Sequence, residues 1–198
     1  MAEDIERRYI VAQDLVLEER DGKTPTIRGH AAVFNQLSED LGGFREQITP
    51  GAFTEAIQKD DVRALIDHLS HLILGRNAAG TLRLSEDAHG LAVEIDPPDT
   101  SYARDLLVSM KRGDITQMSI GFKVRPGGQD WAKDDEGRYI RTLKRLRLFD
   151  VSPVTFPAYP QTDVAVRALG EFRAAEAPAP ADTRWRNEIL RRRLTLAG

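Results

Sequence analysis

Few side chains in this sequence are suited to covalent catalysis. Its 198 residues contain no cysteine, four histidines and seven serines. The lack of cysteine excludes a cysteine nucleophile, disulfides, thiolate zinc sites and iron–sulfur clusters. A covalent mechanism must therefore use another nucleophile, and a mechanism that combines a serine with a histidine has few possible assignments. The histidines are His30, His68, His71 and His89.

One serine lies in a segment with the pattern of a strand. Residues 115–124 read ITQMSIGFKV, and their alternation predicts a β-strand. Met118 and Ile120 fall on the apolar face, and Ser119 falls on the other face. Gly121 shares the face of Ser119 and lacks a side chain, so a substrate could approach the backbone there. The same pattern also fits an ordinary surface serine.

A histidine and an aspartate are predicted on apolar strand faces. His68 ends a strand predicted over 62–68 and shares a face with Ala64. It fits a hydrogen-bonded core histidine or a general base, which needs a hydroxyl at one ring nitrogen and an acceptor at the other. Asp150 is predicted to share a face with Leu148, where a carboxylate needs a partner. That partner is either the histidine or a nearby arginine.

Other chemistries are less well supported. His68 and His71, with Asp67 alongside, could suggest a metal site, but the segment is predicted as strand and loop and no third ligand has a telling spacing. A basic cluster could suggest nucleic acid, but it lies in an alternating strand with no aromatic platform and in a chain of net negative charge, so a solvated face explains it better. We therefore predict no metal, no cofactor and no nucleic-acid partner. The basic cluster comprises Arg138, Arg141, Lys144, Arg145 and Arg147.

The elements that would position these residues are mainly β-strands. Two helices are also predicted, one opening at 49–51 and one between 101 and 112, with Gly113 at its end. About seven strands in one small domain suggest a barrel or a sandwich, with the helices packed outside. The strands are predicted over 8–17, 26–34, 62–68, 81–84, 91–95, 115–124 and 139–149.

Composition changes towards the C-terminus. We predict one domain over 1–168, an Ala/Pro-rich linker over 169–183, and a basic tail over 184–198 that is helical or disordered. Two glycine-containing loops, 35–47 and 126–137, either close over a site or are solvated connections.

Charge and hydropathy predict a soluble protein. The net charge is −3, from 28 basic and 31 acidic residues. The N-terminus is charged and lacks the apolar core of a signal peptide, and no stretch approaches the roughly 18 apolar residues of a membrane span. We therefore expect a cytoplasmic protein with no membrane partner.

Several of these segments, taken together and in this order, resemble the HK97-type prohead proteases of tailed bacteriophages. The resemblance implies a serine endopeptidase with a closed or nearly closed barrel of about seven strands, akin to the herpesvirus assembly proteases. The matching stretches are GHAAVFN (29–35), LGGFREQITPGAF (41–53), VRALIDHLSHLILGR (62–76), GTLRLSEDAHGLAVEIDPPDT (80–100), RDLLVSMKRGDITQMSIGF (104–122) and LFDVSPVTFPAYP (148–160).

The same resemblance implies roles for three residues. His68, six residues before the LGR triplet, matches the catalytic histidine, and Ser119 in MSIGF matches the nucleophile. Asp150 falls where the family most often has glutamate, as the third member. Since the herpesvirus enzymes use a second histidine, His71 is a rival to Asp150, with His30 and His89 behind it. Arg76 and backbone amides near Gly121 are the candidates for binding an oxyanion.

The resemblance also implies substrates, partners and location. Such a protease would cleave scaffold or the scaffold-like segment of the major capsid protein, and itself, inside the prohead in the bacterial host cytoplasm. A homodimer is expected by analogy with the herpesvirus enzymes. The alternatives are a non-catalytic capsid-assembly or scaffold protein, and a hydrolase of the same triad type with another substrate.

Overall fold

The computed structural model describes residues 5–11, 15–21, 23–156 and 163–176. These ranges contain twelve β-strands and three α-helices, so the prediction of a mainly β fold with a few helices is confirmed. The chain divides into two compact units, residues 1–166 and 167–198. All strands, α1 (Thr54–Lys59) and α2 (Ser101–Arg112) belong to the first unit, and α3 (Asp163–Glu176) begins near the boundary.

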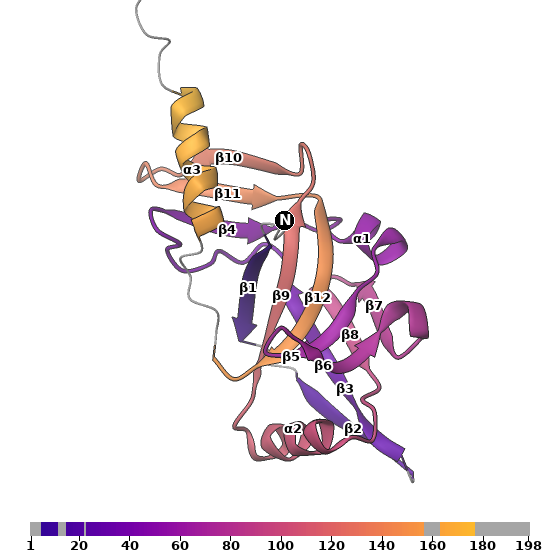
Figure 1. Ribbon diagram of the computed structural model, residues 1–198. Helices are drawn as coiled ribbons and strands as arrows, with labels where there is room; N and C mark the ends of the chain where they lie inside the picture. Colours follow the sequence, from indigo (N-terminus) through magenta and orange to yellow (C-terminus); the bar gives the residue numbers. More distant parts are fainter. Residues whose placement is uncertain (1–4, 12–14, 22, 157–162, 177–198) are drawn as a thin grey trace, which may run out of the picture. The chain divides into compact units, whose positions relative to one another are not determined.

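The largest sheet has five strands in the order β1-β9-β12-β5-β6 (Figure 1). Neighbouring strands are antiparallel except for β12 and β5, which are parallel. The last of the described strands, β12, thus lies in the middle of this sheet. The strands are β1 (Glu6–Val11), β5 (Arg63–Ile66), β6 (Leu69–Arg76), β9 (Gln117–Val124) and β12 (Leu146–Val154).

Two smaller sheets complete the first unit. An antiparallel sheet has the order β2-β3-β8-β7, and a three-stranded sheet has the order β10-β11-β4 with β11 parallel to β4. The strands predicted over 81–84 and 91–95 pair as an antiparallel hairpin, in which Leu82 lies opposite Ile95 and Leu84 opposite Val93. The strands are β2 (Val16–Arg20), β3 (Lys23–Val33), β4 (Phe44–Ile48), β7 (Leu82–Glu86), β8 (Gly90–Ile95), β10 (Gln129–Lys133) and β11 (Tyr139–Leu143).

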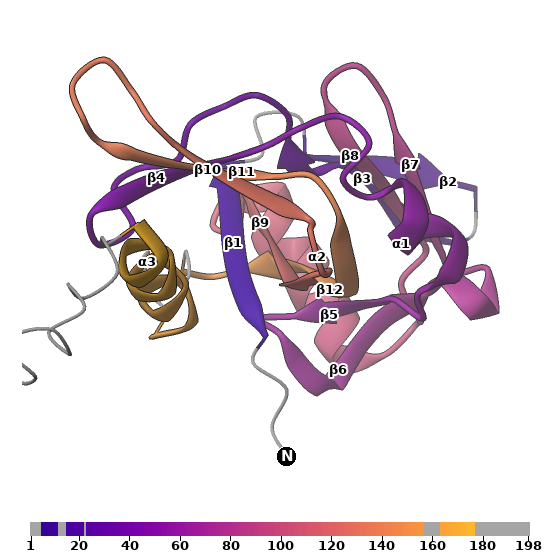
Figure 2. The same cartoon turned by 90° about the horizontal axis from the view of Figure 1, so that it is seen from above.

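The apolar core includes side chains of both the five-stranded and the four-stranded sheet, which face each other in Figure 2. Met118 and Ile120 of β9 belong to the same buried cluster as Ile27 of β3 and Val93 of β8. Helix α1 packs against β12 and β7, and α2 packs against β2 and β6. The predicted end of α2 is confirmed, because Gly113 follows it in the left-handed conformation.

The predicted closed barrel is not found, because the described strands form three open sheets. Two segments predicted as single strands, 8–17 and 139–149, each contain parts of two strands that belong to different sheets. After β9 the chain leaves the five-stranded sheet, forms β10 and β11 in the three-stranded sheet, and returns as β12. The strands therefore belong to distinct sheets, and β1 and β6 are the edge strands of the five-stranded sheet.

Three strands were absent from the prediction. β4 reads FREQI and β10 reads QDWAK, and such short, charged segments carry little strand signal. These two strands lie in the segments predicted as glycine-containing loops. The prediction that each segment either covers a site or is a solvated connection therefore describes it only in part. In β6, LSHLILGR, consecutive apolar residues hide the alternation.

The C-terminal predictions are only partly covered by the described residues. Positions 169–176 of the predicted linker are helical, within α3. The rest of that linker and the basic tail, 184–198, lie outside the described residues. In the described part of the chain, no helix has both the length and the apolar character needed to span a membrane.

Candidate active site

Three side chains are joined by a continuous series of hydrogen bonds. His68 Nε2 lies 2.7 Å from Ser119 Oγ, and His68 Nδ1 lies 2.5 Å from Asp150 Oδ1. Ser119 is fully buried, while the side chains of His68 and Asp150 are 7% and 11% exposed. With a hydroxyl at one ring nitrogen and a carboxylate at the other, the imidazole has the two partners that a general base requires.

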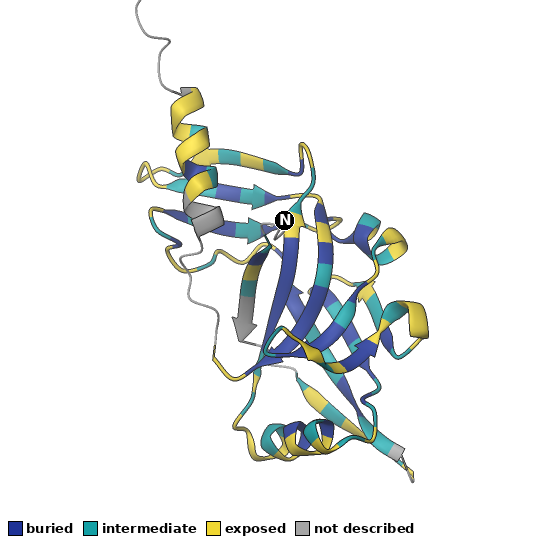
Figure 3. Cartoon of the chain, in the orientation of Figure 1, coloured by how far each residue is buried: buried dark blue, intermediate teal, exposed yellow. Residues whose placement is uncertain are grey.

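Ser119 lies in β9, which is paired with β1 on one side and β12 on the other. The prediction for its face is confirmed: Met118 and Ile120 belong to the core, and the hydroxyl of Ser119 lies on the opposite side of the strand. The expected exposure is wrong. Both faces of β9 are buried over most of its length (Figure 3), because the face opposite the core carries His68 and Asp150.

Asp150 reaches that face because β12 contains a bulge. In the ladder with β9, Leu148 pairs with Phe122, whereas Asp150 pairs with Gly121. Phe149 is therefore the extra residue, and it shifts the alternation of β12 by one position. The prediction that Asp150 shares the face of Leu148 is wrong for this reason, although its predicted need for a partner is met by His68.

His68 lies in the turn between β5 and β6, not at the end of a strand as predicted. Asp67 and His68 have φ values of +48° and +58°, so the chain reverses there and the alternation from Ala64 no longer applies. This conformation costs about 1–2 kcal/mol for a residue with a Cβ atom, so the surroundings must hold it.

Asp67 supplies bonds that hold this turn. Its carboxylate accepts hydrogen bonds from the backbone N–H of Thr155, at 2.7 Å, and from Thr155 Oγ1, at 2.9 Å. Its own N–H donates to the carbonyl oxygen of Pro153 at 3.1 Å. These bonds attach the turn to the end of β12, the strand that carries Asp150. The sequence pattern suggested only a metal ligand at Asp67 and gave no sign of this structural role.

Gly121 has a different use from the one predicted. It is buried, and a Cβ atom built on it would overlap Asp150 Oδ2. The missing side chain therefore makes room for the carboxylate of the site. The backbone beside Ser119 at this position is not open to a substrate.

Comparison with known proteins identifies the family. Residues 13–174 match the family model described as caudovirus prohead serine protease. The chain belongs to this family. Among the curated proteins no match was found. Among solved structures, the capsid assembly protease gp21 of bacteriophage T4 is similar, with 10% sequence identity and a TM-score of 0.46, over 76% of this chain and 96% of that one.

In this member of the prohead protease family, the rival histidines lie away from the hydrogen-bonded group. His71 is exposed on β6, and no hydrogen bond joins it to His68 within the described ranges. His30 Nε2 lies 2.8 Å from Asp87 Oδ2, and the ring of His89 meets that of His30 edge-on at 4.7 Å. These contacts connect β3 with the turn between β7 and β8.

Arg76, a candidate for binding an oxyanion, is already paired. Its guanidinium donates to both carboxylate oxygens of Asp61 at 2.7 Å. It lies opposite Arg63, at the end of the β5–β6 pair remote from His68. At about 3.3 Å per residue, the four residues of β5 hold it roughly 10 Å or more away. Within the described ranges, no group of three or more acidic or histidine side chains could hold a metal ion.

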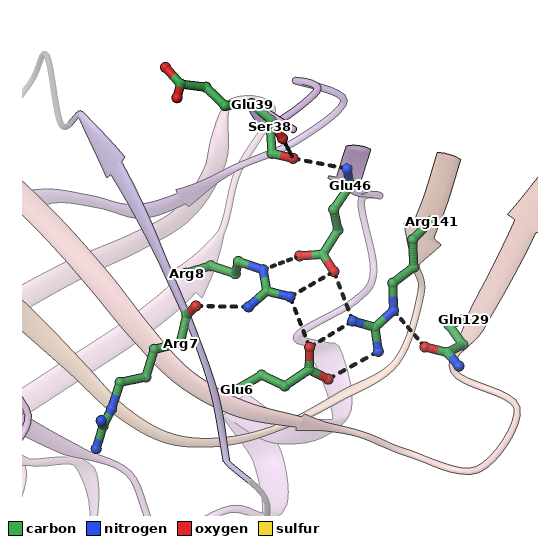
Figure 4. A network of polar contacts seen from close by, with 8 residues as sticks. All are labelled: Glu6, Arg7, Arg8, Ser38, Glu39, Glu46, Gln129 and Arg141. Carbon is green, nitrogen blue, oxygen red and sulfur yellow. Dashed lines mark hydrogen bonds and ion pairs between the residues drawn. The ribbon is translucent and has the colours of Figure 1, made fainter. Parts of the chain in front are cut away.

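A second buried polar cluster, which the sequence did not predict, lies between β1 and the three-stranded sheet (Figure 4). Arg141 Nη1 donates to Glu6 at 2.6 Å and to Glu46 at 2.9 Å, and its Nε donates to Gln129 at 2.7 Å. Arg8 bonds to the same two carboxylates. The cluster ties β1, the neighbour of the strand that carries Ser119, to the three-stranded sheet.

Burial of Arg141 corrects the prediction of a solvated basic face. Its side chain is 2% exposed, whereas Arg138, Lys144, Arg145 and Arg147 are exposed. Burial alone would raise the pKa of Glu6, but hydrogen bonds and charges from Arg141 and Arg8 lower it. Glu6 is therefore held ionised beside its cationic partners.

Proposed function

We propose that the chain is a serine endopeptidase in which Ser119 is the nucleophile, His68 the general base and Asp150 the third member. The observation that supports this most directly is the series of hydrogen bonds from Ser119 Oγ through both ring nitrogens of His68 to Asp150. Asp150 is preferred to His71 as the third member, because it bonds to His68 Nδ1.

The proposed reaction has two stages. His68 Nε2 accepts the proton of Ser119 Oγ as this oxygen attacks the carbonyl carbon of a peptide bond, and then gives that proton to the departing amine. Water attacks the resulting ester with His68 again as base, which releases the second product and restores Ser119. Asp150 holds the imidazole with its Nδ1–H towards the carboxylate and stabilises the imidazolium that forms.

The proposed substrates are scaffold or the scaffold-like segment of the major capsid protein, and the protease itself, inside the prohead in the bacterial host. The family description, prohead serine protease, supports this assignment. Confinement with the substrate supplies a high effective concentration, so tight binding is not needed. Because Ser119 is fully buried, a peptide carbonyl can reach its Oγ only after the residues that cover it move.

Co-expression with the neighbouring capsid and scaffold proteins tests this function. We expect mass spectrometry to find truncated capsid or scaffold protein with the unmodified chain and with Ser85→Ala, an exposed control serine. Ser119→Ala should give no product, because loss of a triad serine costs roughly 10⁴- to 10⁶-fold in rate.

The outcomes separate the alternatives. Unchanged processing by Ser119→Ala would remove this residue from the nucleophile role. Normal assembly with no processing by any variant would favour a non-catalytic assembly protein. A fluorophosphonate probe gives a check that needs no natural substrate, since it should modify Ser119 in the unmodified chain and lose this adduct in His68→Ala.

A further inference from the structure

Ser152 is a buried serine that the proposed reaction does not use. It lies in β12 directly opposite Ser119 in the ladder with β9, and both residues are fully buried. Its Oγ donates a hydrogen bond of 2.6 Å to Asp150 Oδ1. The same oxygen faces His68 Nδ1 at 2.5 Å, so one carboxylate oxygen holds two partners.

We propose that Ser152 is a positioning residue of the active site, which holds the Asp150 carboxylate in place for His68. This proposal rests on the proposed function. Ser152 touches neither the nucleophile nor the ring of His68 by a hydrogen bond, so it acts only through Asp150.

The surroundings of Asp150 explain why a second donor matters. Its Oδ2 lies over Gly121, which has no side chain to hold it, so Oδ1 receives both side-chain hydrogen bonds of the carboxylate. Hydrogen bonds to a charged group are stronger than those between neutral groups, and the burial of this site increases their value. Without Ser152, the carboxylate can rotate about its χ2 bond and weaken its alignment with His68.

Loss of this donor changes the interaction between Asp150 and His68. The hydroxyl compensates part of the negative charge on Oδ1, in competition with His68. When it is removed, His68 Nδ1 is the remaining side-chain partner of this oxygen. The pH profile of kcat/KM should therefore differ between Ser152→Ala and the unmodified chain.

Charged groups on the neighbouring elements do not differ between such variants. Arg7 of β1 lies opposite Gly121, and Arg63 of β5 lies opposite Asp150 and is bonded to Asp61. Asp67 in the turn is held by Thr155, and His71 and Lys123 are exposed on β6 and β9. A difference between the pH profiles of Ser152 variants therefore reports the loss of one hydroxyl.

The test uses a synthetic peptide that spans the cleavage site mapped by co-expression, and the full chain with Ser152→Ala, Ser152→Cys or Ser152→Thr. Alanine removes the donor, cysteine nearly preserves the shape but donates weakly, and threonine keeps the hydroxyl. We expect roughly a 10- to 100-fold fall in kcat with little change in KM for the first two variants, and recovery with threonine.

Two further measurements separate this proposal from the proposed function and from a simple folding defect. Cleavage that Ser119→Ala abolishes establishes the function independently of Ser152. Thermal unfolding shows whether each variant is folded, and the low-field NMR signal of the His68 Nδ1 proton reports its bond to Asp150 without any substrate. If folded Ser152→Ala and Ser152→Cys keep the kcat, the pH profile and the NMR signal of the unmodified chain, the proposal is overturned.

Discussion

Gly121 and Asp150 depend on each other at the level of single atoms. They pair across β9 and β12, and the carboxylate of one occupies the space where a side chain of the other would begin. Any side chain at position 121 must therefore displace the group that is bonded to His68.

We predict that Gly121→Ala disables the site without unfolding the protein. The added methyl group should push Asp150 away from His68 and lower kcat about 100-fold, since a displacement of about 1 Å can cost that much. Overpacking should lower the free energy of unfolding by about 1–3 kcal/mol. Peptide cleavage and thermal unfolding measure the two effects.

The matched control is Gly170→Ala, which adds the same group where no atom lies within 4 Å. Normal cleavage by Gly121→Ala would show that Asp150 is not needed in its observed position.

Sequence patterns alone could not have assembled these residues. Alternation predicts Ser119 on one face of its strand, and His68 and Asp150 on the apolar faces of theirs, which would keep them apart. The bulge at Phe149 and the left-handed turn at Asp67 and His68 move the last two to the side of Ser119. Neither feature has a clear sequence signal. The turn, in particular, lacks the glycine that its positive φ values would favour. Motif resemblance instead pointed to three residues that the structure joins by hydrogen bonds, which alternation alone did not predict.

At the scale of elements, the buried ion pairs of Glu6 and Arg8 attach β1, the neighbour of β9, to the three-stranded sheet. The pKa of Glu6 is lowered from its usual 4.5. A group with a lowered pKa stabilises the fold above its usual pKa, and this contribution is lost as the pH falls through the lowered value.

We therefore predict that Glu6→Gln weakens the attachment of β1. The variant should also lose part of the decrease in stability that acid causes in the unmodified chain. At pH 7 the variant should be less stable by about 3 kcal/mol, because Arg141 stays buried with one charged partner fewer. Below about pH 4.5 the difference should begin to shrink, since Glu6 of the unfolded chain then binds a proton, and the difference is lost as the pH falls through the lowered value. Urea unfolding at several pH values measures both.

Glu136→Gln is the control, because Glu136 pairs with Arg138 at the exposed surface, where a pair contributes about 0–1 kcal/mol. A pH-independent difference for Glu6→Gln would contradict the lowered pKa of Glu6.

Long-range pairing explains what was missed at this scale. Arg141 lies in a run of basic residues that is typical of a solvated face, but its carboxylate partners are 95 and 135 positions away. Helix α2 was predictable because its ends are marked locally by Thr100 and Gly113. Strands β4 and β10 were not, because they depend on pairing with β11 for their formation.

For the whole molecule, we propose a protease domain over 1–168, a linker over 169–183 and a basic tail over 184–198. All three residues of the proposed active site belong to the first unit of the chain. Residues 170–198 contain six arginines and four acidic residues, a composition suited to binding scaffold or capsid protein.

Truncation after Glu176 tests this division. We expect the purified truncated chain to cleave the mapped peptide at the normal rate, because its active site is intact. Incorporation into proheads, measured by immunoblotting of purified particles, should fall. Normal incorporation would show that the tail does not direct the protein into the prohead. Loss of peptide cleavage would show that the protease domain extends beyond Glu176.

The central position of β12 also affects when activity can first arise. This strand is the last of the described strands to leave the ribosome, yet it must enter between β9 and β5, which were made earlier. Such non-local pairing is slow compared with the formation of local hairpins. Until β12 has paired, Asp150 cannot bond to His68, and the turn at Asp67 lacks its hydrogen bond from Thr155. A nascent chain therefore lacks the complete proposed active site until β12 has paired with β9 and β5.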